Sequence, residues 1–527
     1  MIIPKLPTVH LDTTLADLYR ENGIPGSFIV TMYCVFGHMD LHPSFPRELV
    51  WPEDEEPVPY SDDPAEQDHL RKVILGLKPL RRAWGLGNME VLFFGPNITA
   101  KGMKAALSQL PPSQRHIPRM VDLNQGLVSE QLRGMTTTTE GGKNKKKLLF
   151  WRPQGWMKEH DCLIDPQEAY DINSKKYLVT SNMCTPFSII ENLQTTDLSS
   201  AASSSLFHTQ PVPFVVKLCR AGCGFGTYLV RTEAERLTTL AALATYQRRG
   251  VGEVLVSEYV DLVEDLAVHF LVGAPGTAHD RNDPLILGVT IQTLTAGGKW
   301  VGGYIDYSAQ AQLHDYVRET LRDTTRKLPE SFVGWAGIDI VTSKAGEQFV
   351  VDLNARFTGS MPICFMSGHF WKRRELALAQ FAAFEYQASH VDDIYERLEP
   401  LVQSGAIVVT ATATITEGGK VGDGDEEGSH MADIVWGGRD QGGPGTSREG
   451  GTGQAGEEAP DATSRGGRIV RKGAREGSMN IEQAGEIDRQ AGIVQGNGGY
   501  GCNAVVNTLD CKIVHSSRSS WPSTHIV

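Results

Sequence analysis

Three polar side chains, Asp352, Asn354 and Arg356, occupy every second position at the end of an apolar run, VVDLNARFTG (350–359). Alternate side chains of an extended chain share one face. A second strand-like run, GWAGIDIV, carries Asp339 and precedes the first across a turn, SKAGEQ. A hairpin of this kind brings the oxygen-bearing side chains together, and such oxygens suit Mg²⁺. The alternative is that Asp352 and Asn354 cap a turn beside a neutralising Arg356.

A second chemical signal is a lysine followed by glycines, in PFVVKLCRAGCGFGTYLV (213–230). Lys217 ends a short apolar run, and Gly222, Gly224 and Gly226 follow. Glycine-rich loops let backbone amides approach phosphates, and a nearby lysine neutralises phosphate charge. The plain alternative is a glycine-rich hairpin. A dinucleotide-binding turn of an oxidoreductase requires an acidic residue about twenty positions later, and the helical LTTLAALATYQRRGV offers none.

A third signal is a pair of carboxylates around a strand-to-strand connection, in VLVSEYVDLVEDLAVHFLVG (254–273). Glu258 ends the first strand and Asp265 begins the second. Carboxylates beside such a hinge can accept hydrogen bonds from ribose hydroxyls, whereas the alternative is a solvated acidic turn.

The first 135 residues show the pattern of an α/β region. Residues 89–97 form a short apolar run that ends in Gly-Pro, as a buried strand does, and a helical pattern follows. A Thr/Gly/Lys loop at 136–147 precedes a further strand, LLFWRPQGW. We expect a domain over residues 1–165.

The central region alternates strands and helices from about 211 to 365. We expect one helix over 166–182, helical structure over 370–404 and a strand over 406–415, which together define a domain over 166–416. Residues 417–527 are rich in glycine with Ser, Asp, Glu and Arg. Such a segment buries too little apolar surface to offset its ordering entropy, so we expect a disordered tail, either a natural linker or translated sequence that belongs to no fold.

Composition narrows the class of partner. The net charge is −13 with no long basic stripe, which argues against nucleic acid or an anionic membrane surface. Eight cysteines show no zinc-site spacing. The start of the chain lacks the pattern of a secretory leader, and residues 24–39 are too short and glycine-interrupted for a membrane span. We expect a cytoplasmic protein with free thiols.

The order of these motifs resembles the ATP-grasp superfamily: a lysine with a glycine loop, an acidic hinge and a D…(D/E)-x-N-x-R ending. D-alanine–D-alanine ligase and biotin carboxylase are familiar members. The resemblance covers about 170–365, and LGVTIQTLTAGGKWVGGYIDY and DLNARFTGS are most similar to fungal ATP-grasp proteins of undefined substrate. It implies an α/β class: a Rossmann-like domain followed by an ATP-grasp fold with antiparallel sheets.

The resemblance also implies roles for the phosphate-binding residues. Lys217 would contact the ATP phosphates, and the three glycines would form the loop that covers them. An earlier lysine normally contacts the nucleotide as well, and the sequence offers Lys175 or Lys176 without deciding between them.

The other positions transfer in the same way. Glu258 would lie at the adenine hinge and Asp265 would bind ribose. Asp339, Asp352 and Asn354 would hold Mg²⁺, with Mn²⁺ as the alternative metal.

Arg356 would steady phosphate oxygens, and two departures from the family pattern concern catalysis. Asp352 replaces the more usual Glu, which shortens the arm by one methylene. Gly337 stands where D-alanine ligases carry an arginine, a role that Arg220 or Arg356 would have to fill.

The implied reaction is ligation. A substrate carboxylate attacks the γ-phosphate of ATP, and an amine captures the acyl phosphate; positioning and charge neutralisation are the protein's main contribution. The partners are therefore small-molecule carboxylates and amines, and relatives often form homodimers. The rival hypothesis is an ATP-binding pseudoenzyme without ligase activity.

Overall fold

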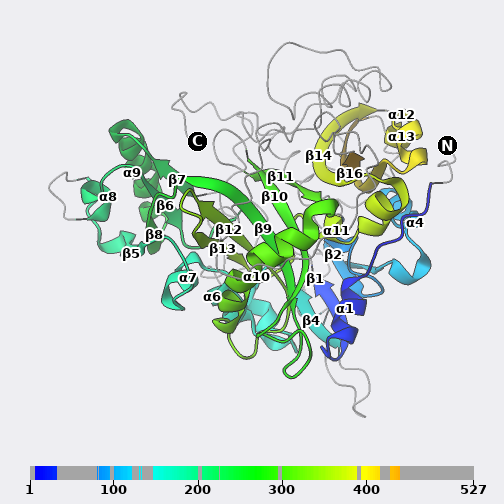
Figure 1. The fold of residues 1–527 in the computed structure, drawn as a ribbon, viewed down its shortest axis with the longest axis horizontal. Helices are drawn as coiled ribbons and strands as arrows, with labels where there is room; N and C mark the ends of the chain where they lie inside the picture. The colour runs from blue at the N-terminus through cyan, green and yellow to red at the C-terminus, as the bar shows by residue number, and fades with distance from the viewer. Residues whose placement is uncertain are drawn as a thin grey trace, which may run out of the picture.

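The computed structural model describes residues 6–31, 80, 82–94, 100–121, 130, 132, 146–199, 205–222, 224, 226–294, 300–388, 393–415 and 428–438, and the structural statements that follow concern these residues. They form three sheets with flanking helices (Figure 1). No helix in these ranges is long and apolar enough to cross a bilayer. Of the expected tail, residues 417–427 and 439–527 lie outside the described residues. Residues 136–145 of the expected Thr/Gly/Lys loop also lie outside them.

The first sheet is entirely parallel, with the order β3-β2-β1-β4. Its strands are β1 Ser27–Thr31, β2 Glu90–Phe94, β3 Ile117–Val121 and β4 Lys146–Phe150. The helices α1 Leu15–Glu21 and α4 Ala100–Ser108 belong to this region. The Thr14 side chain accepts a hydrogen bond from the Asp17 amide and so begins α1. A parallel, Rossmann-like sheet confirms the α/β prediction for the first region.

The second sheet is antiparallel, with the order β5-β8-β6-β7. Its strands are β5 Ser188–Asn192, β6 Phe214–Leu218, β7 Thr227–Val230 and β8 Glu253–Glu258. α9, Glu233–Arg248, begins with a capping box in which Thr232 and Glu235 satisfy each other's backbone amides. With α8, Leu206–Thr209, this sheet lies at one end of the long axis of the molecule (Figure 1).

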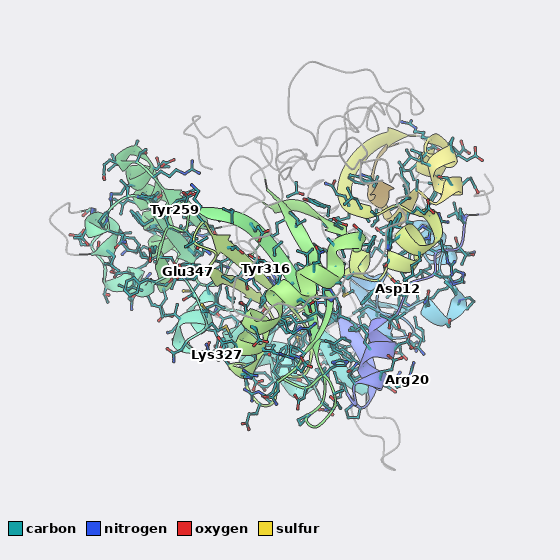
Figure 2. All side chains as sticks on the ribbon, in the orientation of Figure 1. Asp12, Arg20, Tyr259, Tyr316, Lys327 and Glu347 are labelled. Atoms are coloured by element: carbon teal, nitrogen blue, oxygen red, sulfur yellow. The ribbon has the colours of Figure 1, made fainter. Side chains whose placement is uncertain are left out.

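The third sheet has eight strands in the order β13-β12-β9-β10-β11-β14-β16-β15, all antiparallel to their neighbours. They are β9 Leu262–Val272, β10 Leu285–Leu294, β11 Trp300–Asp306, β12 Gly334–Ser343, β13 Gln348–Asn354, β14 Leu378–Ala388, β15 Ile407–Ile415 and β16 Gly428–Gly438. α10, Gln310–Arg326, lies across it, and Tyr316 on this helix hydrogen-bonds Thr342 of β12 at 2.9 Å (Figure 2).

One apolar core joins the parallel sheet to the eight-stranded sheet. It includes Val30 of β1, Leu271 of β9, Trp335 of β12 and Phe381 of β14, all buried. Because these side chains share one core, the two sheets hold a fixed position relative to each other. Residues that follow β4 and β13 are thereby brought together.

Three sequence-based expectations differ from the structure. The helix expected over 166–182 is two helices, α6 Pro166–Ile172 and α7 Lys175–Thr180. Asn173 caps the first, and the Ser174 side chain accepts a hydrogen bond from the Lys176 amide at 3.3 Å to begin the second. Short polar side chains of this kind compete with the helix for backbone groups.

The second difference concerns residues 370–404, where helix was expected. Residues Leu378–Ala388 are strand β14, hydrogen-bonded to β11 on one side and β16 on the other; the π-helical turn Gly368–Lys372 precedes it, and the short helices α12 Asp393–Arg397 and α13 Glu399–Ser404 follow it. Pairing on both edges outweighs the helix propensity of its Ala, Leu, Glu and Gln residues.

The third difference is β16, which lies inside the segment expected to be a tail from 417. It pairs with β14 and β15 along its length. The glycine-rich composition concealed this strand because its apolar part, ADIVW, is only five residues long. The expectation that the chain is a disordered tail from residue 417 is therefore wrong for residues 428–438, which form a strand.

Candidate functional site

The acidic side of the candidate site lies on three neighbouring strands of the eight-stranded sheet. Asp339 of β12 is the register partner of Asp352 on β13, so the hairpin expected from the sequence places these two carboxylates opposite each other. Directly opposite side chains of antiparallel strands lie on the same face. Asp265 lies on β9, on the other side of β12, and its charge also acts on Asp339.

Burial and mutual repulsion perturb these carboxyl groups. Burial first, and then the charges of Asp352 and Asp265, hold the pKa of Asp339 well above its usual range. Burial raises the pKa of Asp265 to about 6, against the opposing effect of Lys217. Asp339 and Asp265 therefore hold their protons more tightly than ordinary aspartates do, and a cation bound beside them would favour their ionised forms.

The basic side comes from two other elements. Lys175 is 6% exposed at the start of α7; its Nζ donates to the Ala221 carbonyl at 2.6 Å and lies 3.4 Å from Asp352 Oδ1. Lys217 on β6 donates to the Val351 carbonyl at 3.1 Å. Burial and the nearby Lys175 lower the pKa of Lys217 to about 8, while the surrounding carboxylates oppose that shift.

The structure separates the two lysines that the sequence left open. Lys175 points to Asp352, whereas the Lys176 ammonium group lies 2.6 Å from Glu253 Oε1 on β8. Consecutive side chains of a helix diverge by about 100°, so only one of the pair can face the site. Lys175 is therefore the lysine that belongs with the acidic side chains.

The glycine loop connects β6 to β7. Gly224 and Gly226 have φ of 77° and 64°, the left-handed region that favours glycine. A Cβ on Gly226 would lie 2.6 Å from the Leu218 side chain, so the turn leaves no room for another residue. Gly222 is buried next to Ala221, whose carbonyl accepts from Lys175. The loop thus sits beside the buried lysine.

The two predicted arginines lie in different surroundings. Arg356 Nη1 donates to Asn354 Oδ1 at 2.8 Å, which keeps Arg356 next to the candidate metal ligands. Arg220 instead stacks over Tyr170 at 4.1 Å and lies 4.0 Å from Asp171 Oδ1 of α6. The described contacts of Arg220 are with α6, and they do not bring it to the acidic strands.

Glu258 ends β8 and is exposed, with its amide donating to the Phe187 carbonyl at 2.8 Å. It belongs to the second sheet, whereas Asp265 belongs to the third, so the two carboxylates lie on either side of the connection, as the sequence indicated. Asp265 faces Lys217 and Asp339 rather than open solvent.

The resemblance implies a bound divalent cation, and the nearby oxygen-bearing side chains are the candidate ligands for it. Among the described residues, no three His, Cys, Asp or Glu side chains come close enough to enclose a metal by themselves. Mg²⁺ commonly uses one or two carboxylates and completes its shell with water and phosphate oxygens. Asp339, Asp352 and the Asn354 amide match that chemistry, and a bound cation would offset the burial and the neighbouring charges that raise the pKa of Asp339.

Two further polar residues belong to this region, and sequence reasoning missed the first of them, Gln292. Gln292 of β10 donates to Asp265 Oδ1 at 3.3 Å and also hydrogen-bonds Asp339. His269 of β9 is buried, with its two ring nitrogens 3.1 Å from Thr290 Oγ1 and 2.9 Å from Thr358 Oγ1. A usable signal for Gln292 was present, because Thr290 and Gln292 are polar at alternate positions of a mainly apolar strand.

The central region of the chain matches a known protein family. Residues 175–360 match the family model described as the ATP-grasp domain. No curated protein matches the sequence. Among solved structures, the L-amino acid ligase from Bacillus licheniformis has a TM-score of 0.41 at 11% identity, over 79% of this chain and 95% of that one.

Two further solved structures are similarly distant. N5-carboxyaminoimidazole synthetase from Staphylococcus aureus, complexed with ADP, has a TM-score of 0.38 at 12% identity, over 67% of this chain and 90% of that one. Biotin carboxylase from Campylobacter jejuni has a TM-score of 0.40 at 10% identity, over 68% and 84%. The family match over 175–360, which contains both lysines, the glycine loop and all the acidic strands, decides the assignment. Residues 175–360 of this chain are therefore similar to the ATP-grasp domain.

Proposed function

We propose that the protein is an ATP-dependent ligase that activates a substrate carboxylate as an acyl phosphate for capture by an amine. The observation that carries this proposal is that two lysines, Lys175 and Lys217, lie near two aspartates, Asp339 and Asp352. The four side chains come from four different elements, α7, β6, β12 and β13. Two ammonium groups facing two carboxylates form a site for a bound triphosphate and its cation.

In this proposal the chain's own groups position the reacting atoms. Lys175 and Lys217 bind the phosphates and neutralise charge that accumulates as the carboxylate oxygen attacks the γ-phosphorus. The bond from that phosphorus to the bridging oxygen breaks, and ADP leaves. Bound phosphate would restore the pKa of Lys217 toward its usual value, because negative charge favours its protonated form.

Arg356 steadies phosphate oxygens, since Asn354 fixes its guanidinium beside the site. Mg²⁺ or Mn²⁺ held by Asp339, Asp352 and Asn354 would supply further charge neutralisation when bound. Gly222, Gly224 and Gly226 cover the phosphates, Glu258 lies at the adenine hinge, and Asp265 binds ribose. The amine then attacks the acyl carbon and displaces phosphate.

Calorimetric titration of the full chain with Mg-ATP tests the nucleotide site. Lys217→Ala and Asp352→Asn should each weaken binding about 10- to 100-fold, the effect of losing one hydrogen bond or ion pair to a charged group. Lys327→Ala is the matched control, because that lysine pairs with Asp323 at 2.6 Å on α10. A folded wild type that does not bind Mg-ATP would sink the proposal.

Hydroxylamine trapping across a panel of carboxylic acids then tests the reaction, because an acyl phosphate gives a stable hydroxamate. One observation favours a second candidate, ATP binding without ligation. A Cβ on Gly337 would lie 3.0 Å from Thr358 Cγ2, so the position cannot accept the arginine of D-alanine ligases without local movement. Mg-ATP binding with no hydroxamate from any acid would select this second candidate.

A further inference from the structure

His269 lies on the face of the eight-stranded sheet that carries the acidic side chains, yet the proposed ATP site gives it no role. It follows Asp265 by four positions on β9, and residues an even number apart on a strand share a face. His269 is the register partner of Gly337 on β12, which in turn is the partner of Asn354 on β13. The imidazole is therefore two strands away from a candidate metal ligand.

The His269 ring is held through both of its nitrogens. Nε2 lies 3.1 Å from Thr290 Oγ1, and Nδ1 lies 2.9 Å from Thr358 Oγ1. Burial lowers the pKa of His269 to about 3, so the ring is neutral near pH 7 and has one donor and one acceptor nitrogen. Thr290 belongs to the neighbouring strand β10, so the sheet fixes the ring and the ring in turn holds Thr358.

Gly337 makes room for this contact. A Cβ on Gly337 would lie 3.0 Å from Thr358 Cγ2 and 3.6 Å from His269 Nδ1. The two side chains therefore meet directly over a position of β12 that has no side chain. Thr358 is drawn onto the sheet at this point, although it lies beyond the end of β13.

Thr358 follows Arg356 by two residues, in a segment that no strand pairing positions. Residues 355–360 lie between β13 and the short helix α11, Met361–Cys364, and belong to neither. Before this segment, Asn354 accepts from Arg356 Nη1, and the Arg356 guanidinium carbon lies 5.9 Å from the centroid of the Trp151 ring. The guanidinium is thus tied to β13 on one side, and the chain just after it is tied to β9 by Thr358.

We infer that His269 is a positioning residue of the ATP site, which fixes residues 355–360 through Thr358 and so sets where the Arg356 guanidinium meets the phosphate oxygens. His269 acts through Thr358 and does not itself touch the nucleotide. The inference rests on the Mg-ATP binding of the proposed function. A guanidinium that is already held in place loses less freedom when the ligand binds, which is how such a contact raises affinity.

Calorimetric titration of the full chain with Mg-ATP tests the contact. Thr358→Val should weaken binding about 3- to 10-fold, the order of the cost of immobilising one long side chain. Thr358→Ser keeps the hydroxyl and should restore the affinity. Thr342→Val is the matched control, because this hydroxyl lies on the other face of β12, 2.9 Å from Tyr316, and its loss should leave Mg-ATP affinity unchanged.

Two double-variant comparisons separate positioning from a general loss of structure. In an Arg356→Gln background Thr358→Val should cause no further loss, because the group that it positions is gone, whereas a merely structural contact would cost the same in both backgrounds. His269→Phe should weaken binding as Thr358→Val does, and the two together should lose no more than either alone. If His269→Phe does not fold, the half-buried Thr358 variants still decide the question.

The inference and the ligase proposal fail in different ways. Wild-type affinity in Thr358→Val, an undiminished loss in the Arg356→Gln background, or no recovery in Thr358→Ser would overturn the role of His269 alone. A folded wild type that does not bind Mg-ATP would reject both. Mg-ATP binding that depends on Thr358 and Arg356 as expected, with no hydroxamate from any acid, would reject the ligation chemistry and leave the positioning role standing.

Discussion

The acidic and basic sides of the candidate ATP site are built in different ways. Asp265, Asp339 and Asp352 lie on β9, β12 and β13, three neighbouring strands of one sheet. Lys175 and Lys217 come from α7 and from β6 of another sheet. The three carboxylates are therefore positioned by one sheet, whereas the two lysines are positioned by a helix and by a strand of another sheet.

The carboxylates are held in place by strand pairing, whereas the lysines are held by contacts between different elements. Strand pairing keeps Asp339 opposite Asp352, and in the absence of a ligand there is a free-energy cost of ionising Asp339, which comes first from burial and then from the charges of Asp352 and Asp265. The lysines offset it only while α7 and β6 keep their places relative to the third sheet, through Lys175 on Asp352 and Lys217 on Val351. Changes on either side should therefore weaken nucleotide binding, and changes on the acidic side should also alter stability.

The neighbouring lysines give the sharpest test of this comparison. Lys175→Met should weaken Mg-ATP binding about 10- to 100-fold, because a buried charge-assisted contact is lost. Lys176→Met should leave the affinity close to wild type, because Lys176 pairs with Glu253 at a half-exposed site. Calorimetry measures both, and equal losses in the two variants would break the distinction between them.

Asp339→Asn tests the repulsion on the acidic side. In the folded protein the pKa of Asp339 is raised, so the folded state keeps a proton that the unfolded state loses above pH 4. The free energy of unfolding of the nucleotide-free protein therefore falls as pH rises above that value. The variant removes this slope and should be about 1–3 kcal/mol more stable than wild type at pH 7, while binding Mg-ATP more weakly.

Urea denaturation in EDTA between pH 4.5 and 8 measures this effect. Asp265, with a pKa raised to about 6, contributes a slope of the same sign between its ordinary value and pH 6, and that slope should persist in the Asp339 variant. Parallel stability curves for the two proteins across the whole range would show that the pKa of Asp339 is not raised in the folded state.

Lys344→Gln should have the smallest effect. Lys344 lies 2.5 Å from Asp261 and joins the β12–β13 turn to the β8–β9 connection, two places marked by Glu347 and Tyr259 in Figure 2. Both partners are largely exposed, so solvent and salt screen the pair. We expect an unchanged free energy of unfolding and unchanged Mg-ATP affinity; a clear loss of affinity would mean that this surface pair helps to set how the two sheets meet.

The acidic side of the site could be predicted from the sequence because it depends on local geometry. The alternation of Asp352, Asn354 and Arg356, and the short turn after Asp339, fix which side chains share a face before any long-range contact is known. The glycine loop could be read in the same way, since Gly224 and Gly226 adopt positive φ. The family match over 175–360 agrees with that order of motifs.

Other features depend on contacts between distant segments. The helix propensity of residues 378–388 gave the wrong element because pairing with β11 and β16 decides it. The placement of Arg220, one of the two arginines expected to fill the catalytic role of the arginine in D-alanine ligases, also depends on tertiary structure, and its described contacts are with Tyr170 and Asp171.

The sequence by itself determined the local arrangements: the acidic hairpin, the glycine turn and the alternation of strands and helices in the centre, because each is set within a few residues of chain. Only the tertiary structure decided that Lys175 rather than Lys176 meets Asp352, and that Arg82 and Arg152 meet Arg356 around Trp151. These contacts join residues 177 to 274 positions apart, and the core packing that brings such segments together has no local signature in the chain.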